Sequence, residues 1–207
     1  MDDALEVVCL RHAEAENVVA GASGALPGAA LTERGRVQAN AVAHALPAID
    51  HVYASTAERA WRTAETIGRV RGVGVTKMEG LVEMGIGGLE GAVDPVTRAR
   101  TAEVLRSWVV DGKLDERVAD GETGHAVVER VVNAFRAIAA EHRHSASASV
   151  GAVAVVGHVA SLTVGLSVLC GLGSTVWGAP LPHAVPFRVL VDGRGWRCAA
   201  WPGLWPV

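Results

Sequence analysis

The sequence predicts an α/β fold, namely a three-layer α/β/α sandwich with a largely parallel central sheet. Short runs of β-branched and other apolar residues alternate along the chain with longer segments whose apolar residues recur at helical spacing. One short run, residues 153–156 (VAVV), is wholly apolar and has glycines on both sides, as expected for a strand covered on both faces. Strands that are separated by helices favour parallel pairing.

The first half of the chain supplies three of the expected strands and two helices. The strands are expected at residues 7–10, 51–54 and, as a short edge strand, 73–77. Thr32 is a favourable N-cap for a helix that Pro47 ends. A second helix is expected over residues 57–70, before a glycine-rich stretch.

The second half of the chain continues the alternation. Helices are expected over residues 95–111, 122–142 and 161–169, with the buried strand 153–156 between the last two. A terminal hairpin is expected from residues 185–191 and 196–201, around the turn Asp192-Gly193-Arg194-Gly195. No linker divides the chain, so residues 1–207 are expected to form a single domain.

Composition and charge exclude several classes of partner. The chain has 207 residues, of which 50% are hydrophobic and 20% charged, and its formal net charge is −3. No overall positive field would attract nucleic acid or an anionic membrane, and no apolar run approaches the ~18 residues of a membrane span. We therefore expect neither a nucleic-acid nor a membrane partner.

The N-terminus and the cysteines favour a cytoplasmic location. The chain opens with Met1-Asp2-Asp3, which is acidic where a secretory signal would be basic. The three cysteines, Cys9, Cys170 and Cys198, are odd in number and far apart. They suggest neither a disulfide framework nor a metal site, and are expected as small core residues in a reducing compartment.

Polar residues collect directly after the expected strands. Arg11 and His12 follow the first strand, Ser55 and Arg59 follow the second, and His158 follows the buried strand. Ligands of parallel α/β sheets bind beyond the carboxyl ends of the strands, so these side chains should converge there. Guanidinium groups beside helix N-termini suit a phosphate dianion, since each planar fork can hold two oxygens at once.

The same cluster can perform chemistry on phosphorus. Neighbouring guanidinium groups disfavour the protonated form of His12 and so keep its imidazole nucleophilic. If His12 attacks phosphorus, another group must protonate the leaving oxygen. Glu83, at the start of the glycine-rich loop 83–91, is the natural candidate.

Six motifs occur in an order and at intervals that resemble the histidine phosphatase superfamily, the phosphoglycerate-mutase-like family. They are LRHAEAEN (10–17), LTERGRVQA (31–39), STAERAWRTAETI (55–67), EMGIGGLEG (83–91), GET (121–123) and GHV (157–159). The resemblance covers nearly the whole chain and implies the fold of that family. It also implies the site: His12 as phospho-accepting nucleophile, Arg11, Arg59 and His158 as the rest of the phosphate pocket, Glu83 as general acid and then base, and Asn17 as a substrate contact.

The sequence departs from the family pattern at four places. Ala13 and Val159 stand where the family's R-H-G and G-H-G motifs end in glycine. Asn17 lies six residues after Arg11, whereas the family's phosphate-contacting Asn usually lies seven after its Arg. Residues 18–30 carry no charge, where mutase relatives have an Arg and an Asp.

Some residues have a simpler expected role. Glu122 is expected to complement the dipole of the helix that it opens, and His183 is expected as a loop residue although relatives often have an Asn near the site there. Residues 92–120, which include Trp108, form a variable segment expected to act as a lid. Three arginines of that segment could face inward and bind a second anion: Arg98, Arg100 and Arg106.

These features predict a metal-independent phosphatase that hydrolyses a small phosphomonoester through a phosphohistidine and needs no cofactor. A phosphoglycerate-type mutase and a non-catalytic phosphate-binding module on the same fold are the alternatives. The missing charge in residues 18–30 argues against the mutase, and the complete set of candidate site residues argues against the module. The partner is then a small phosphate ester, and the apolar end WPGLWPV leaves a homodimer open.

Overall fold

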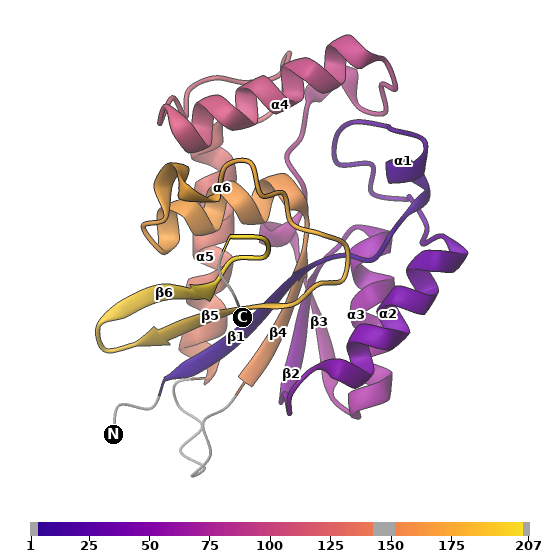
Figure 1. Ribbon diagram of the computed structural model, residues 1–207, viewed down its shortest axis with the longest axis vertical. Helices are drawn as coiled ribbons and strands as arrows, with labels where there is room; N and C mark the ends of the chain where they lie inside the picture. The colour runs from indigo at the N-terminus through magenta and orange to yellow at the C-terminus, as the bar shows by residue number, and fades with distance from the viewer. Residues whose placement is uncertain (1–3, 143–151, 205–207) are drawn as a thin grey trace.

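A six-stranded sheet forms the centre of the protein, with strand order β3-β2-β4-β1-β5-β6 (Figure 1). The structure is a computed structural model, and it describes residues 4–142 and 152–204. The strands are β1 (Leu5–Arg11), β2 (His51–Ser55), β3 (Gly74–Met78), β4 (Ala152–Gly157), β5 (Phe187–Asp192) and β6 (Gly195–Ala200). The four strands β3, β2, β4 and β1 pair in parallel, and the β5–β6 hairpin adds an antiparallel edge next to β1.

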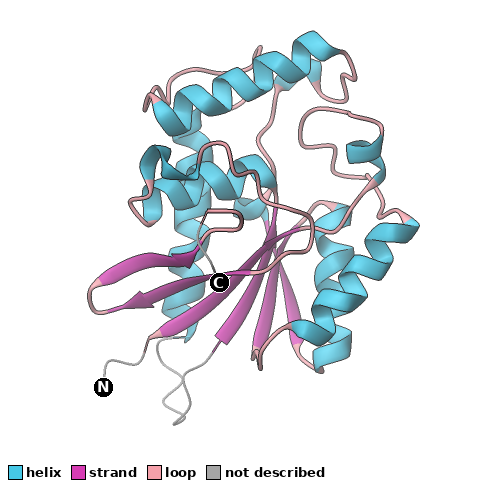
Figure 2. Ribbon diagram, in the orientation of Figure 1, coloured by secondary structure: helices cyan, strands magenta, loops and turns pink. Residues whose placement is uncertain are grey.

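Helices cover both faces of this sheet (Figure 2), which confirms the predicted α/β class. They are α1 (Glu16–Val19), α2 (Glu33–Ala45), α3 (Glu58–Arg71), α4 (Pro95–Val110), α5 (Gly124–His142) and α6 (Val159–Leu169). Three short 3₁₀ helices lie at Glu79–Leu81, Gly87–Leu89 and Gly173–Val176. No described helix has the length and apolar character needed to cross a bilayer.

The pleat of the strands divides the core in two. In β1, Val7 and Cys9 point into the core shared with α5 and α6, while Val8 and Leu10 point into the core shared with α2 and α3. Successive side chains of a strand face opposite sides, so a strand with helices on both faces must be apolar throughout. Every residue of β4 is buried accordingly.

The first residues of two helices differ from those that the apolar periodicity predicts. Helix α5 starts at Gly124, because the Thr123 hydroxyl accepts the Ala126 N–H and caps the helix, which leaves Glu122 outside it. Helix α6 starts at Val159, since His158 occupies the N-cap position. The four-residue helix α1 is too short to give a periodic signal.

The segment 92–120 lies beyond the carboxyl ends of the parallel strands, where α4 crosses the top of Figure 1. Val104 and Trp108 of α4 are buried in the larger core, and the Trp108 Nε1–H donates to the Glu116 carbonyl at 2.9 Å. The aromatic residue therefore anchors this segment. A lid function for the segment stays a prediction.

Helix α2 supports the loop that follows β1. Thr32 caps the helix by accepting the Gly35 N–H at 2.9 Å, and the Thr32 N–H donates to the Glu14 carbonyl at 3.1 Å. This brings Gly35 against the chain: a Cβ there would lie 2.0 Å from the Glu14 carbonyl oxygen. Only glycine allows the helix this close to residues 12–16.

Gly35→Ala should therefore destabilise the protein, although the same change in an open helix is stabilising. Overpacking against a backbone oxygen costs about 1–3 kcal/mol, and each kcal/mol corresponds to roughly 2–4 °C in Tm for a chain of this size. Calorimetry of Gly35→Ala tests this. Gly28→Ala is the control, since a Cβ there meets nothing within 4 Å. Equal Tm values for both variants would contradict the close approach.

Candidate active site

The register of three parallel strands brings the candidate residues to one edge of the sheet. Arg11 of β1 pairs with Gly157 of β4, and Ala54 of β2 pairs with Val156, so the three strands end level with one another. His12 continues β1, and its N–H donates to the Gly157 carbonyl at 3.0 Å. Arg59 enters from α3, which starts three residues after β2.

The hydrogen bonds of His12 fix its tautomer. Its Nδ1 lies 2.7 Å from the Ala13 carbonyl oxygen, which can only accept, so Nδ1 carries the proton. Its Nε2 accepts the Nε–H of Arg59 at 3.1 Å and therefore holds a lone pair. The ring is 3% exposed. His12 thus presents Nε2 as the nucleophilic atom.

Electrostatics keep this imidazole neutral. Burial holds the pKa of His12 well below its usual value, and the neighbouring His158 and Arg59 lower it further. Burial, followed by the charges of Arg59 and Arg11, lowers the pKa of His158 in the same way. Both imidazoles are uncharged near neutral pH, so the positive charge of the site belongs to its guanidinium groups.

His158 lies next to the nucleophile with one ring nitrogen free. The His12 and His158 ring centroids are 5.1 Å apart. The His158 Nε2 is 2.8 Å from the Ser55 Oγ, which also accepts the Ala57 N–H. If the serine hydroxyl donates to Nε2, His158 carries its proton on Nδ1, which is buried and has no partner among the residues that the structure describes.

The two arginines make different contacts. The Arg59 terminal nitrogens donate to the Leu26 and Ala25 carbonyls at 2.7 and 2.8 Å, so its fork holds the loop after α1 as well as His12. One hydrogen remains free on each of those nitrogens. Arg11 donates one terminal N–H to the Leu181 carbonyl at 3.1 Å, and its Nε is buried without a partner in the described part of the chain.

Unpartnered polar atoms concentrate at this site. Within the described parts of the chain, buried side-chain nitrogen or oxygen atoms without a partner occur at Arg11, Asn17, Ser107, His158 and Ser161. Three of these residues belong to the site: Arg11 precedes the nucleophile, His158 lies against it, and Ser161 is in the first turn of α6 beside Glu83. Buried polar atoms in proteins are nearly always paired, so a cluster of unpaired ones marks the place of a polar ligand.

Glu83 lies at the N-terminus of α6. Its carboxylate accepts three backbone N–H groups: Met84 at 2.9 Å, Ser161 at 2.9 Å and Ala160 at 3.1 Å. Its negative charge is also favourably placed at the positive end of the helix. Glu83 therefore connects the glycine-rich loop to the helix that His158 caps.

Arg130, a residue that the sequence analysis does not single out, holds the Glu83 loop in place. It donates to the carbonyls of Gly80, Val82 and Glu83 at 3.1, 2.6 and 3.1 Å, and to both carboxylate oxygens of Glu122 at 2.8 and 2.9 Å. These contacts use all five guanidinium N–H groups. Glu122 is thus an ion-pair partner that also accepts the Gly85 N–H, rather than a first-turn acid of α5.

Asn17 and His183 lie at the periphery of the cluster. Asn17 is half-buried in α1, and among the described residues it shares no hydrogen bond or ring contact with the other candidates. His183 lies in a loop, as expected, but its ring is next to that of His12. Its ring centroid is 5.3 Å from that of His12, and its Nδ1 is 2.9 Å from the His12 carbonyl oxygen.

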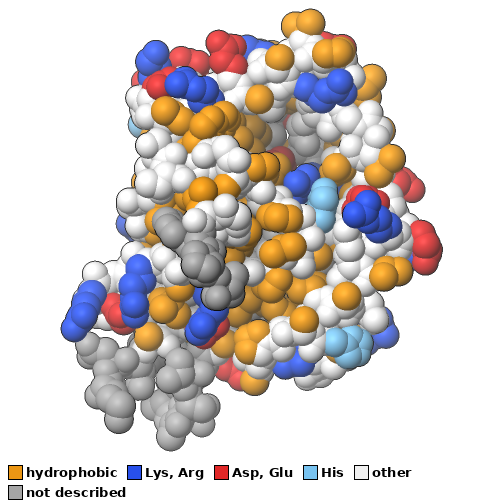
Figure 3. Space-filling model, in the orientation of Figure 1, with side chains coloured by type: hydrophobic (Ala, Val, Ile, Leu, Met, Phe, Trp, Pro, Cys, Tyr) orange, Lys and Arg blue, Asp and Glu red, His pale blue; other side chains and the backbone are white. Residues whose placement is uncertain are grey.

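The described residues contain no group of three or more His, Cys, Asp or Glu side chains arranged to hold a metal ion. Figure 3 shows a recess on one face of the molecule, with Lys or Arg and His atoms at its edge. The site therefore offers guanidinium and imidazole groups to a ligand.

The fold matches solved structures of phosphatases. A mycobacterial glucosyl-3-phosphoglycerate phosphatase superposes with a TM-score of 0.78 at 24% identity, covering 96% of this chain and 98% of the other. A putative alpha-ribazole-5′-P phosphatase from Escherichia coli gives 0.75 at 22% identity, with 96% and 97% coverage. A phosphoserine phosphatase mutant from Entamoeba histolytica gives 0.77 at 18% identity, with 97% and 98% coverage.

A family model agrees with these structures, whereas a search of curated proteins found no match. The model describes the histidine phosphatase superfamily (branch 1), and it matches residues 7–202. This confirms the resemblance that the six motifs indicate, and the solved structures agree with it in fold. The chain belongs to the histidine phosphatase superfamily.

Proposed function

We propose that this protein is a phosphatase that hydrolyses a small phosphomonoester through a phosphohistidine at His12. The observation that supports this best is the state of the nucleophile, which is a buried, neutral imidazole whose Nδ1 proton is fixed and whose Nε2 lone pair accepts the Nε–H of Arg59, a bond that the attack on phosphorus replaces. The unpartnered Nε of Arg11 and Nδ1 of His158 lie in the same cluster and would bind the phosphoryl oxygens.

The reaction then has two steps. In the first, His12 Nε2 bonds to phosphorus while the bond from phosphorus to the ester oxygen breaks, and that oxygen takes a proton from Glu83. In the second, Glu83 removes a proton from water, which attacks phosphorus, so phosphate leaves and His12 is restored. The Glu83 carboxylate has about four lone-pair sites, three of which accept backbone N–H groups, so one site on Oε2 is left to carry the proton that it donates.

The surroundings of the site support a substrate with little charge beyond its phosphate. Arg100 and Arg106 pair with acidic residues of their own segment. Arg98 contacts the carbonyls of Gly21 and Val93 at 3.2 and 2.9 Å. The segments on both sides of Arg98 and of the loop that it contacts expose apolar side chains: Val19 of α1, Leu89 and Val93 before α4, and Val96 of α4. A neutral or partly apolar ester body fits this rim better than a second anionic group.

His12→Ala should abolish turnover while the fold stays intact. Removal of a nucleophile typically lowers the rate by roughly 10³-fold or more. Turnover of an aryl phosphate checks this, and quenched wild-type reactions should carry acid-labile phosphate on His12. His44→Ala is the control, because that ring is exposed and contacts only a carbonyl of its own helix. Near-normal activity of His12→Ala would end the proposal in favour of a binding module or another mechanism.

Activity should survive chelation of divalent metals. Arg11, Arg59 and His158 provide the positive charge and donors that a metal ion would otherwise supply. Initial rates with and without EDTA test this directly. Loss of activity in EDTA that Mg²⁺ or Zn²⁺ restores would require a different mechanism.

Arg130→Lys and Glu83→Gln should change the relative rates of alkyl and aryl phosphate hydrolysis in the same way. Lysine cannot reproduce the five-donor fork, so the loop carrying Glu83 shifts, and a displacement of about 1 Å can cost roughly 100-fold in rate. The hydrolysis of alkyl phosphates, which need a protonated leaving oxygen, should slow far more than the hydrolysis of aryl phosphates. Arg136→Lys, an exposed change on the same helix, is the control. Equal losses on both ester types would remove Glu83 from the acid role.

Neutral-bodied monophosphates should give higher kcat/KM than 3-phosphoglycerate or sugar bisphosphates. Buried apolar area contributes roughly 25 cal/mol per Å², which favours an apolar ester body against the exposed rim. Interconversion of 2- and 3-phosphoglycerate should be undetectable. A preference for bisphosphates that Arg98→Ala abolishes and Arg100→Ala leaves intact would show instead that Arg98 binds a second anion.

A further inference from the structure

His183 is a third imidazole beside the nucleophile, outside the set that the motifs indicate. Its ring lies almost as close to the His12 ring as that of His158 does, with centroids 5.3 and 5.1 Å apart. Its Nδ1 faces the His12 carbonyl oxygen at 2.9 Å and must donate to it, which assigns the Nδ1 proton. The other nitrogen, Nε2, forms no hydrogen bond with any of the residues that the structure describes and is the part of the ring available to a ligand.

The backbone holds this ring firmly in place. Residue 183 bridges Arg11 of β1, and the next N–H, that of Ala184, donates to the Arg11 carbonyl at 3.0 Å. Ala184 has a φ of +54°, a strained conformation for a residue with a Cβ. Strain of this kind persists where surrounding contacts impose it, and it concentrates at functional sites.

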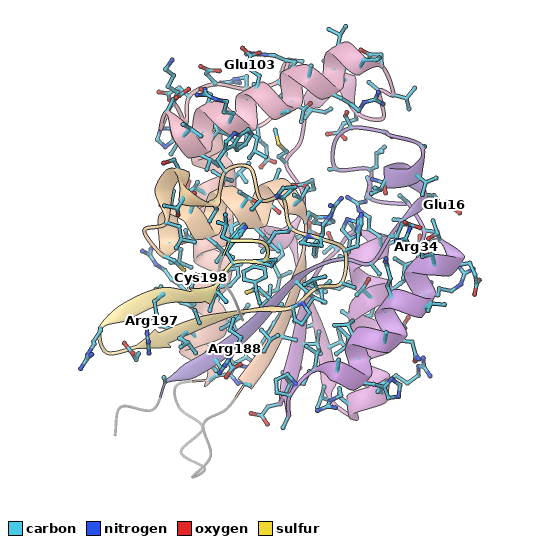
Figure 4. The ribbon with its side chains drawn as sticks, viewed as in Figure 1. Glu16, Arg34, Glu103, Arg188, Arg197 and Cys198 are labelled. Carbon is cyan, nitrogen blue, oxygen red and sulfur yellow. The ribbon has the colours of Figure 1, made fainter. Side chains whose placement is uncertain are left out.

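The charges around His183 come from β1, from the loop after it and from α2. Among these charges Arg11 has the largest effect on the pKa of His183; Glu14 and Arg34 act less strongly and in opposite directions, and they pair with each other at 3.4 Å. Figure 4 labels Arg34 at the start of α2. Burial is the largest cause lowering the pKa of His183, with Arg11 next, so the free ring is neutral near neutral pH.

We propose that His183 is a third phosphate-binding imidazole, whose Nε2 contacts an oxygen of the phosphoryl group held at His12; this inference rests on the proposed function. A dianion next to the ring favours the imidazolium form, so phosphate binding draws a proton onto Nε2 from solvent. The charged ring then donates Nε2–H to the phosphoryl oxygen and keeps the hydrogen bond from Nδ1–H to the His12 carbonyl.

The sign of the pH dependence follows from this coupling. Below the pKa of His183 in the complex, the ring is an imidazolium and strengthens binding of the dianion. As the pH rises through that pKa, the proton and the extra affinity are lost together. Ionisation of phosphate itself and of the other site residues is common to every variant, so the ratio of two dissociation constants isolates His183.

The experiment compares His183→Asn with the wild type, using inorganic phosphate as the probe. The asparagine side-chain nitrogen can take the place of Nδ1 and keep the bond to the His12 carbonyl, while the group at Nε2 is removed. A charge-assisted hydrogen bond is worth about 1.5–3 kcal/mol, so the Kd of the variant should be roughly 10-fold or more above that of the wild type near pH 6. The ratio should fall towards about 1 near pH 8.5.

Two further proteins complete the test. His125→Asn, an exposed ring beside Asp115 at 3.6 Å, should bind phosphate as the wild type does at every pH. His183→Gln places a neutral amide near Nε2 and should lose the same pH dependence, so it replaces the Asn variant if that one does not fold. The role of His183 would be overturned if the ratio of the variant Kd to the wild-type Kd stayed at 1, or if the variant lost the same affinity for phosphate at both pH values. Wild-type turnover of an aryl phosphate reports separately on the proposed function.

Discussion

The parallel pairing of β4 with both β1 and β2 sets the geometry on which the site depends. The residues of the site lie at or just after the ends of these strands. The pairing register places the last residues of the three strands, Arg11, Ser55 and Gly157, side by side. His12 and His158 then leave the sheet side by side because their strands are hydrogen-bonded neighbours. A slip of one residue in this ladder would turn the side chains of a strand to the opposite face and separate the two imidazoles.

The site brings positive charges together, and side-chain carboxylates neutralise little of that charge. Arg11 and Arg59 are bonded mainly to backbone carbonyls, which satisfy the N–H groups without neutralising the charge. Desolvation of two cations is unfavourable, and an arriving dianion relieves it. Glu83, the carboxylate that acts most strongly on both guanidiniums, itself accepts three backbone N–H groups.

Local pattern was enough to predict the sheet, the main helices and the family. Thr32 and the apolar run 153–156 are signals contained in a few neighbouring residues, and the six motifs extend them along the chain. The contacts of Arg130 could not be predicted in this way, because the guanidinium joins Gly80 to Glu122 across the fold and looks like any helix arginine in the sequence. Likewise, the Asn that relatives often have at position 183 indicates that this position is near the site, but no local pattern indicates that the His183 ring meets the His12 ring.

Glu90 and Arg59 hold the loop at residues 23–26 through main-chain atoms alone. Glu90 accepts the N–H groups of Ala25 and Ile86, both at 2.7 Å, while Arg59 binds the Ala25 and Leu26 carbonyls. Main-chain atoms are the same whichever side chains the loop carries. Gly24 must stay glycine, because its φ is +95° and a Cβ there would lie 2.1 Å from the Glu90 Oε2. A position such as Ala25 is not constrained in this way, so its side chain can change during evolution while the path of the loop stays fixed beside the nucleophile, and new ester specificities can arise there without rebuilding the reaction centre.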